Sequence, residues 1–272
     1  MKIILFCSSQ SNQKALAHKI HNNFNLHKLI VLKPLKKKIK FEIFKYLKIL
    51  TFRFLGNVIT LCKFRGMWFG MLDYYSRKYS IFPIKPDLIV EDINNLMVEK
   101  IIDEEKPELV IVSGTNLLKE RLISKILQYG KVMNLHTGIS PYIKGGPDCT
   151  CWCLFLKEFS LIGNTVMWLD KGIDSGNIIA TEQTILNGDE SLVELKIKTM
   201  NHGHDLYLRA IERFYNKIPL NNIKQSNLSN HGLFLSKDWG LKEQIISLFN
   251  YYIHFRGSNI VSTNKKLISL EK

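Results

Sequence analysis

The sequence predicts an α/β fold, in which a Rossmann-like, mostly parallel sheet carries helices on both faces and a short extension follows at the C-terminus. An apolar strand over residues 2–8, a helix over about 11–24 and a second buried strand over 29–32 form a β-α-β opening. Such an opening is typical of a parallel sheet. Residues 109–113 are apolar throughout, as central parallel strands are.

The composition supports one large domain. The chain has 272 residues, 46% of them hydrophobic, so a sizeable core can form. No apolar run approaches the roughly 18 residues of a membrane span, and we expect no stable membrane insertion. The five cysteines are an odd number and the first residues resemble a strand rather than an export signal. Both observations favour a reducing, cytoplasmic location.

Positive charge is concentrated in one segment. Residues 33–65 hold ten basic side chains and one carboxylate, a net +9 of the formal +14. Apolar residues recur there at helical spacing, from Ile39 to Val58. We therefore expect a catalytic domain over 1–215 with a helical basic insertion at about 36–80. Two interpretations stay open: a helix packed on the sheet with a solvated basic face, or a surface that attracts phosphates, RNA or anionic lipid.

Residues 216–272 are predicted to be a short C-terminal extension. They contain polar loop and one short helix over 241–252, and they leave a homodimer element open. Ser191 and Glu194 have the spacing of a capping box, which predicts a helix from there to about residue 214.

A polar pair marks the end of one predicted strand. Residues 131–136 form a short buried strand, and Asn134 and His136 stand two apart at its C-terminal end. Residues two apart on a strand face the same side, so both side chains should enter one space. Another strand, 164–169, ends in a turn that carries Asp170 and Asp174. Ligands of open α/β sheets bind at strand ends.

Other patterns exclude functions. The turn after the first strand contains no glycine, so the dinucleotide fingerprint is absent, which argues against a nucleotide-cofactor dehydrogenase. On a helix, side chains two residues apart point in directions that differ by about 200°. This applies to the cysteines at 149, 151 and 153 and to the histidines at 202 and 204. We therefore predict packing thiols and no metal site.

Three motifs together resemble the folate-dependent formyltransferases over roughly residues 105–185. The motifs are Asn134-x-His136, the Ser140-Pro141 turn with Lys144-Gly145-Gly146, and Asp170-x-Gly172-x-Asp174-x-Gly176. The family includes glycinamide ribonucleotide, methionyl-tRNA and sugar-nucleotide N-formyltransferases. This sequence departs from the family pattern at Tyr142, where a basic residue often follows the turn proline.

The resemblance implies a direct transfer of a formyl group from N10-formyltetrahydrofolate to an amine. That reaction passes through a tetrahedral oxyanion, which needs hydrogen-bond donors aimed at it. Asn134 can donate its amide, and His136 can donate as a cation or take the proton of the amine. Asp174 could hold the imidazole charged and oriented, or relay the proton through water.

The resemblance also implies where the two substrates bind. The backbone of the turn after residue 113 and a carboxylate of the 170–174 loop are expected to hold the pterin; these residues are Gly114, Thr115, Asn116, Leu117, Leu118 and Asp170. The turn after the catalytic strand is expected to contact the acceptor through Ser140, Pro141, Tyr142, Lys144, Gly145 and Gly146. The last three could hold a phosphate, or form a plain turn.

The expected acceptor is a nucleotide-linked, dTDP-type amino-6-deoxyhexose made for surface polysaccharide. This choice follows from elimination within the family, because fewer than 60 residues follow the predicted core and contain no alternating strands of a tRNA-binding barrel. We expect no nucleic-acid partner. Two alternatives stay open: a methionyl-tRNA or other amine formyltransferase, and a non-catalytic RNA- or membrane-binding protein that uses residues 33–65.

Overall fold

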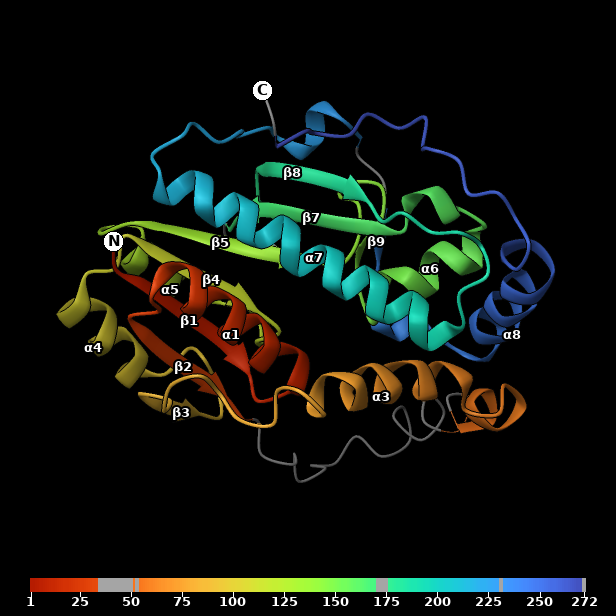
Figure 1. Ribbon diagram of the computed structural model, residues 1–272, viewed down its shortest axis with the longest axis horizontal. Helices are drawn as coiled ribbons and strands as arrows, with labels where there is room; N and C mark the ends of the chain where they lie inside the picture. Colours follow the sequence, from red (N-terminus) through yellow and green to blue (C-terminus); the bar gives the residue numbers. More distant parts are fainter. Residues whose placement is uncertain (34–50, 52–53, 170–175, 230–231, 271–272) are drawn as a thin grey trace.

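A seven-stranded sheet forms the centre of the computed structural model, which describes residues 1–33, 51, 54–169, 176–229 and 232–270 (Figure 1). Its strands lie in the order β3-β2-β1-β4-β5-β7-β8. Their bounds are β1 Ile3–Ser8, β2 Lys28–Leu32, β3 Leu88–Val90, β4 Leu109–Ser113, β5 Lys131–His136, β7 Gly163–Trp168 and β8 Ile178–Gln183. β7 runs antiparallel to both neighbours, and the other pairs are parallel. The predicted fold class is confirmed.

Helices cover both faces of this sheet. α1 (Ser11–Phe24) and α7 (Leu192–Tyr215) pack on one face, where Leu5, Ile111 and Met133 point. α4 (Leu96–Glu105) and α5 (Glu120–Ile126) pack on the other, against the alternate residues of the same strands. Successive residues of a strand point to opposite faces, so each strand contributes side chains to two separate cores.

The remaining elements lie outside the main sheet and the four helices that cover its faces. They are α3 Lys63–Ser76, α6 Cys149–Leu156, α8 Leu241–Asn250, the short strands β6 Lys144–Gly145 and β9 Leu233–Phe234, the 3₁₀ turns η1 Phe159–Leu161, η2 Gln225–Asn227 and η3 Ser236–Asp238, and the π-helical turn η4 Tyr251–Phe255. Figure 1 shows α3 passing along α1 and α7 toward α8. A third core forms there around Trp152 and Trp239.

The N-termini of α7 and α1 differ in whether a side chain of the local sequence caps the helix. The capping box of α7 is confirmed: Ser191 Oγ accepts from the Glu194 N–H, and the Glu194 carboxylate accepts from the Ser191 N–H at 2.8 Å. α1 differs, because Gln10 occupies its N-cap and makes no side-chain capping hydrogen bond. The polar side chains of its first turn make tertiary contacts instead: Ser11 Oγ donates to the Leu72 carbonyl at 2.6 Å, and Asn12 Nδ2 approaches Met200 Sδ at 3.8 Å.

The apolar pattern predicted for the insertion does not match the side chains that are buried near its end. Residues 54–59 are helical, but Phe54 and Val58, which the stripe placed inside, are 66% and 52% exposed. Leu61 and Cys62 have positive φ angles of 49° and 55°, so the chain breaks there. α3 then starts with a new phase and buries other side chains; these are Phe64, Met67, Met71 and Tyr75. Much of the predicted basic helix lies outside the described residues.

The C-terminal segment packs along the rest of the molecule. Ile223 forms a β-bridge to Ile178, and the Ile268 N–H donates to Thr181 Oγ1 at 2.7 Å. Asn250 Nδ2 donates to the carbonyls of Leu154 and Phe155 at 2.9 Å, which fastens α8 to the end of α6. Among the helices that the structure describes, none combines the length and apolarity that a bilayer crossing needs.

Candidate active site

The C-terminal ends of β4 and β5 bring two predicted site regions together. Val112 of β4 is in register with Asn134 of β5, and Gly114 follows two residues later. Gly114 has φ +66°, and a Cβ there would meet Gln13 Nε2 at 2.9 Å, so the sequence needs glycine at this turn. β1 and β4 are neighbours in a sheet whose strand order reverses there, which is where α/β sheets bind ligands.

The turn after β4 is fastened to the loop before α4. Asn116 Oδ1 accepts from the Ile93 N–H at 3.1 Å, and Asn116 Nδ2 donates to Asp92 Oδ1 at 2.8 Å. Asn94 Nδ2 donates to the Leu117 carbonyl at 3.0 Å. The backbone N–H of Asn94, followed by the side-chain amides of Asn94 and Asn116, lowers the pKa of Asp92. The predicted pterin-binding backbone therefore has a fixed shape, although Thr115 and Leu117 remain accessible.

Asn134 and His136 lie on the side of β5 predicted from their spacing. Met133 and Leu135 belong to the core under α1 and α7, whereas Val132 belongs to the opposite core. Asn134 and His136 therefore share the Val132 face, beyond the ends of α4 and α5. Asn134 is half-buried and His136 is 8% exposed. Both can address one small ligand group at the strand end.

A thiol stands beside the histidine, which sequence reasoning missed. Cys149 Sγ lies 3.3 Å from His136 Nε2 and 3.7 Å from the Gly145 carbonyl oxygen. Cys149 opens α6, whose N-cap Asp148 accepts from the Thr150 N–H at 3.0 Å. The thiol can hydrogen-bond the imidazole and influence which nitrogen carries the proton. Burial raises the pKa values of Cys151 and Cys153, which agrees with the predicted packing role of those two thiols.

One threonine side chain holds the loop after β5 through two hydrogen bonds. Thr165 Oγ1 donates to the Gly138 carbonyl at 2.6 Å and accepts from the Ser140 N–H at 2.9 Å. Ser140 Oγ is buried and has no hydrogen-bond partner in the described part of the chain. Pro141 is also buried, and its peptide bond with Ser140 is cis. Ser140 is thus positioned by its backbone, and its hydroxyl remains available.

The predicted acceptor turn contacts the C-terminal segment. Gly145 has φ +96° on β6, and a Cβ there would collide with the Phe234 carbonyl of β9. Lys144 Nζ donates to Gln225 Oε1 at 3.3 Å, and Gly146 accepts from Trp152 Nε1 at 3.0 Å. Tyr142 points elsewhere, because its hydroxyl donates to the Lys266 carbonyl at 3.1 Å.

Asp170 and Asp174 lie outside the described residues, so their predicted roles stay predictions. The described end of that loop is anchored: Gln225 Nε2 donates to the Gly176 carbonyl at 2.8 Å. Since Gln225 also binds Lys144, the loop end and the acceptor turn share one partner.

The described residues contain no group of three His, Cys, Asp or Glu side chains that could hold a metal ion. His202 instead contacts Thr184 Oγ1 at 2.9 Å and Glu182 Oε2 at 3.1 Å. His204 is fully buried with neither ring nitrogen hydrogen-bonded in the described structure, and burial lowers its pKa to about 3.

Part of the chain is similar to a known protein family. Residues 91–211, which include the turn after β4, the end of β5 and α6, match the model of the formyl transferase family. The resemblance drawn from the three sequence motifs is thereby confirmed.

Several curated relatives are methionyl-tRNA formyltransferases. Methionyl-tRNA formyltransferases of Syntrophus aciditrophicus and Clostridium tetani are 29% and 28% identical over 121 and 144 residues. These stretches are 43% and 50% of this chain but 38% and 46% of those proteins, so the chain spans less than half the length of the curated relatives.

Solved structures extend the likeness to nearly the whole chain. An N-formyltransferase from Helicobacter canadensis, in complex with folinic acid and dTDP-3-aminofucose, has a TM-score of 0.53 at 16% identity over 91% of this chain and 80% of that one. A phosphoribosylglycinamide formyltransferase from Anaplasma phagocytophilum has a TM-score of 0.54 at 15% identity over 87% and 98%. At these identities the likeness shows a shared fold.

Proposed function

We propose that the protein transfers a formyl group from N10-formyltetrahydrofolate to the amine of a nucleotide-linked amino sugar, of the dTDP-amino-6-deoxyhexose type. The observation that carries this proposal is the placement of Asn134 and His136 on one face of β5, beside the fastened turn after β4. Solved proteins of the same fold support it, because one binds folinic acid together with a dTDP-amino sugar.

In the proposed mechanism, the turn from Gly114 to Leu118 presents backbone groups to the pterin. The formyl carbon then lies near the end of β5. The acceptor amine attacks that carbon, and Asn134 donates a hydrogen bond to the oxyanion that forms. His136 takes the proton of the amine, and Asp174 orients the imidazole. The bond between the formyl carbon and N10 then breaks, and tetrahydrofolate leaves with N10 protonated by the proton that His136 took.

Asp170 is proposed to contact the pterin from the second loop. Lys144, with its ammonium on the acceptor turn, is proposed to bind an anionic group of the acceptor.

One comparison favours a second candidate, since the curated relatives are methionyl-tRNA formyltransferases. The two candidates differ in the acceptor and not in the chemistry. A panel should contain dTDP-, UDP- and GDP-linked amino sugars and methionyl-tRNA, each with N10-formyltetrahydrofolate, and mass spectrometry should detect a gain of one formyl group.

We expect formylation of a nucleotide sugar. Formylation of methionyl-tRNA alone would contradict the nucleotide-sugar acceptor and favour the second candidate. Tetrahydrofolate without the formyl group is the matched control. No formyl gain on any acceptor, with N10-formyltetrahydrofolate left intact, would contradict formyl transfer.

A further inference from the structure

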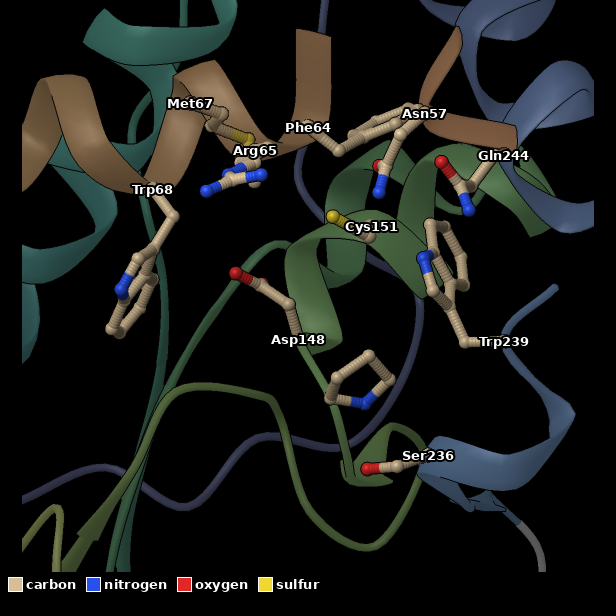
Figure 2. Close-up of a pocket in the computed structure, with 11 residues that line it drawn as sticks. Asn57, Phe64, Arg65, Met67, Trp68, Asp148, Cys151, Ser236, Trp239 and Gln244 are labelled. Atoms are coloured by element: carbon tan, nitrogen blue, oxygen red, sulfur yellow. The ribbon is translucent and has the colours of Figure 1, made fainter. Parts of the chain in front are cut away.

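A cavity of about 390 Å³ lies between α3, α6 and the start of α8, outside the strand-end site (Figure 2). Figure 2 shows aromatic side chains on opposite sides of it, with Trp68 from α3 facing Trp239 across the space. Most of its wall comes from residues 57–68 and 236–244, which lie outside the segment that matches the formyl transferase family. Its volume lies within the range of small-molecule pockets.

The aromatic walls are held in place. Phe64 meets Trp239 edge-on at 5.7 Å between ring centroids, and Trp239 meets Trp152 at 5.1 Å. On the opposite side Lys196 Nζ lies 5.5 Å from the Trp68 ring and 2.7 Å from Asp148 Oδ2. This lysine is almost fully buried and neutralises the carboxylate in the cavity wall. The result is a slot of fixed aromatic faces, which suits a flat ring.

A buried amide in the wall lacks a partner. Gln244 is 3% exposed, and its Oε1 makes no hydrogen bond with any residue that the structure describes. Figure 2 shows its amide at the cavity beside that of Asn57. A buried carbonyl without a partner is unfavourable, so a ligand N–H that donates to Gln244 Oε1 would be stabilised here. A side-chain amide offers one donor and one acceptor group and can pair with the edge of a nucleobase.

A cation completes the lining. Arg65 is exposed beside the cavity, and its guanidinium contacts the Phe69 ring at 5.4 Å. No carboxylate of the described chain forms an ion pair with it within 4.0 Å. A guanidinium that has no ion pair among the described residues and stands beside an aromatic slot is suited to a phosphate attached to the bound ring.

The first turn of α6 joins this cavity to the candidate active site. Cys149 faces His136, whereas Cys151 lines the cavity. Residues two apart on a helix point about 200° apart, so one helical turn separates the two spaces. We infer that the cavity binds the nucleobase end of the nucleotide that carries the acceptor amine, with the base between Trp68 and Trp239, its edge on Gln244 and a phosphate at Arg65. This inference rests on the proposed function.

The test measures nucleotide binding apart from turnover. dTDP, UDP and GDP are titrated into the full chain, and tryptophan fluorescence reports stacking. We expect quenching by at least one of them, lost in Trp68→Leu. Gln244→Met keeps the length of the side chain and removes an unpartnered carbonyl, so it should fold at least as well as wild type. We expect it to weaken binding about tenfold, and Arg65→Ala to do the same for the diphosphate but not for the free nucleoside.

Controls separate this inference from the proposed function. Phe249→Ala, on the exposed side of α8, and Lys63→Ala, at an exposed lysine two residues before Arg65, should bind like wild type. In turnover, Gln244→Met should raise KM for the nucleotide sugar more than it changes kcat. Formyl transfer with wild-type KM in both Gln244→Met and Arg65→Ala would overturn the inference and leave the proposed function intact. Quenching that needs Gln244, without formyl transfer, would overturn the proposed function and leave only the nucleotide-binding cavity.

Discussion

The structure at the ends of β4 and β5 depends on local sequence patterns, whereas the structure around α3 and α8 depends on contacts between distant segments. Around β4 and β5, short local patterns decide the structure: apolar strands, a glycine with positive φ and a polar pair at spacing two. Around α3, α6 and α8, side chains from three distant segments meet in one core, centred on Trp239 and Trp152. In the proposed function, the first region carries the formyl transfer, and the second holds the acceptor.

Trp239→Ala should produce the largest change in stability, because it removes the residue that joins Phe64 of α3 to Trp152 of α6. Loss of a buried tryptophan costs about 3–5 kcal/mol. Urea unfolding followed by circular dichroism measures it, with the exposed Phe249→Ala as control. A single transition at lower urea would show that the two regions unfold together; an unchanged main transition would show that the α3–α8 region is separate from the sheet.

The candidate catalytic pair should affect turnover and leave stability nearly unchanged. Asn134→Ala and His136→Asn should each lower kcat about 10²–10³-fold, the typical loss for one oxyanion-site donor. The double variant should lose less than the product of both factors, since both residues serve one step. The exposed His254→Asn is the control. Wild-type turnover in His136→Asn would refute the mechanism.

The buried His204 should make stability pH-dependent. Burial, assisted by the charge of Lys19, lowers its pKa to about 3 in the folded state, whereas an unfolded histidine titrates near 6.5. Between these values the unfolded chain binds a proton that the folded chain does not. Stability should therefore fall as the pH is lowered from 6.5 toward 3, by about 1.4 kcal/mol per pH unit.

His204→Phe should remove this contribution, because phenylalanine fills the same space beside Tyr75 and cannot be protonated. Denaturant unfolding at pH 7, 6 and 5 measures the difference between the variant and wild type. Parallel stability curves for the two proteins would show that another group causes the acid sensitivity.

The smallest effect should come from the capping box of α7. Ser191→Ala removes the acceptor for the Glu194 N–H and should lower the free energy of unfolding by about 1 kcal/mol. Ser191→Asn, which keeps an acceptor, is the matched control. Equal losses in both variants would mean that the cap contributes through packing and not through its hydrogen bond.

Sequence reasoning reached the first region because its signals are local. The spacing of Asn134 and His136 fixed their common face, and Gly114 marked the turn. Cys149 was missed as a neighbour of His136, because a Cys-x-Cys-x-Cys pattern does not say which thiol turns toward a strand thirteen residues earlier. The cavity was missed for the same reason, since Gln244 and Trp68 share no motif and meet only after α3 and α8 have packed.

The pairing of β6 with β9 has a consequence for the order of folding. Lys144 and Gly145 pair with Leu233 and Phe234, about 90 residues further along the chain. Closing so long a loop is slow compared with local contacts, and on the ribosome the second strand emerges after the sheet strands. The acceptor turn should therefore reach its final shape late in biosynthesis, when the strands that hold Asn134 and His136 can already have paired.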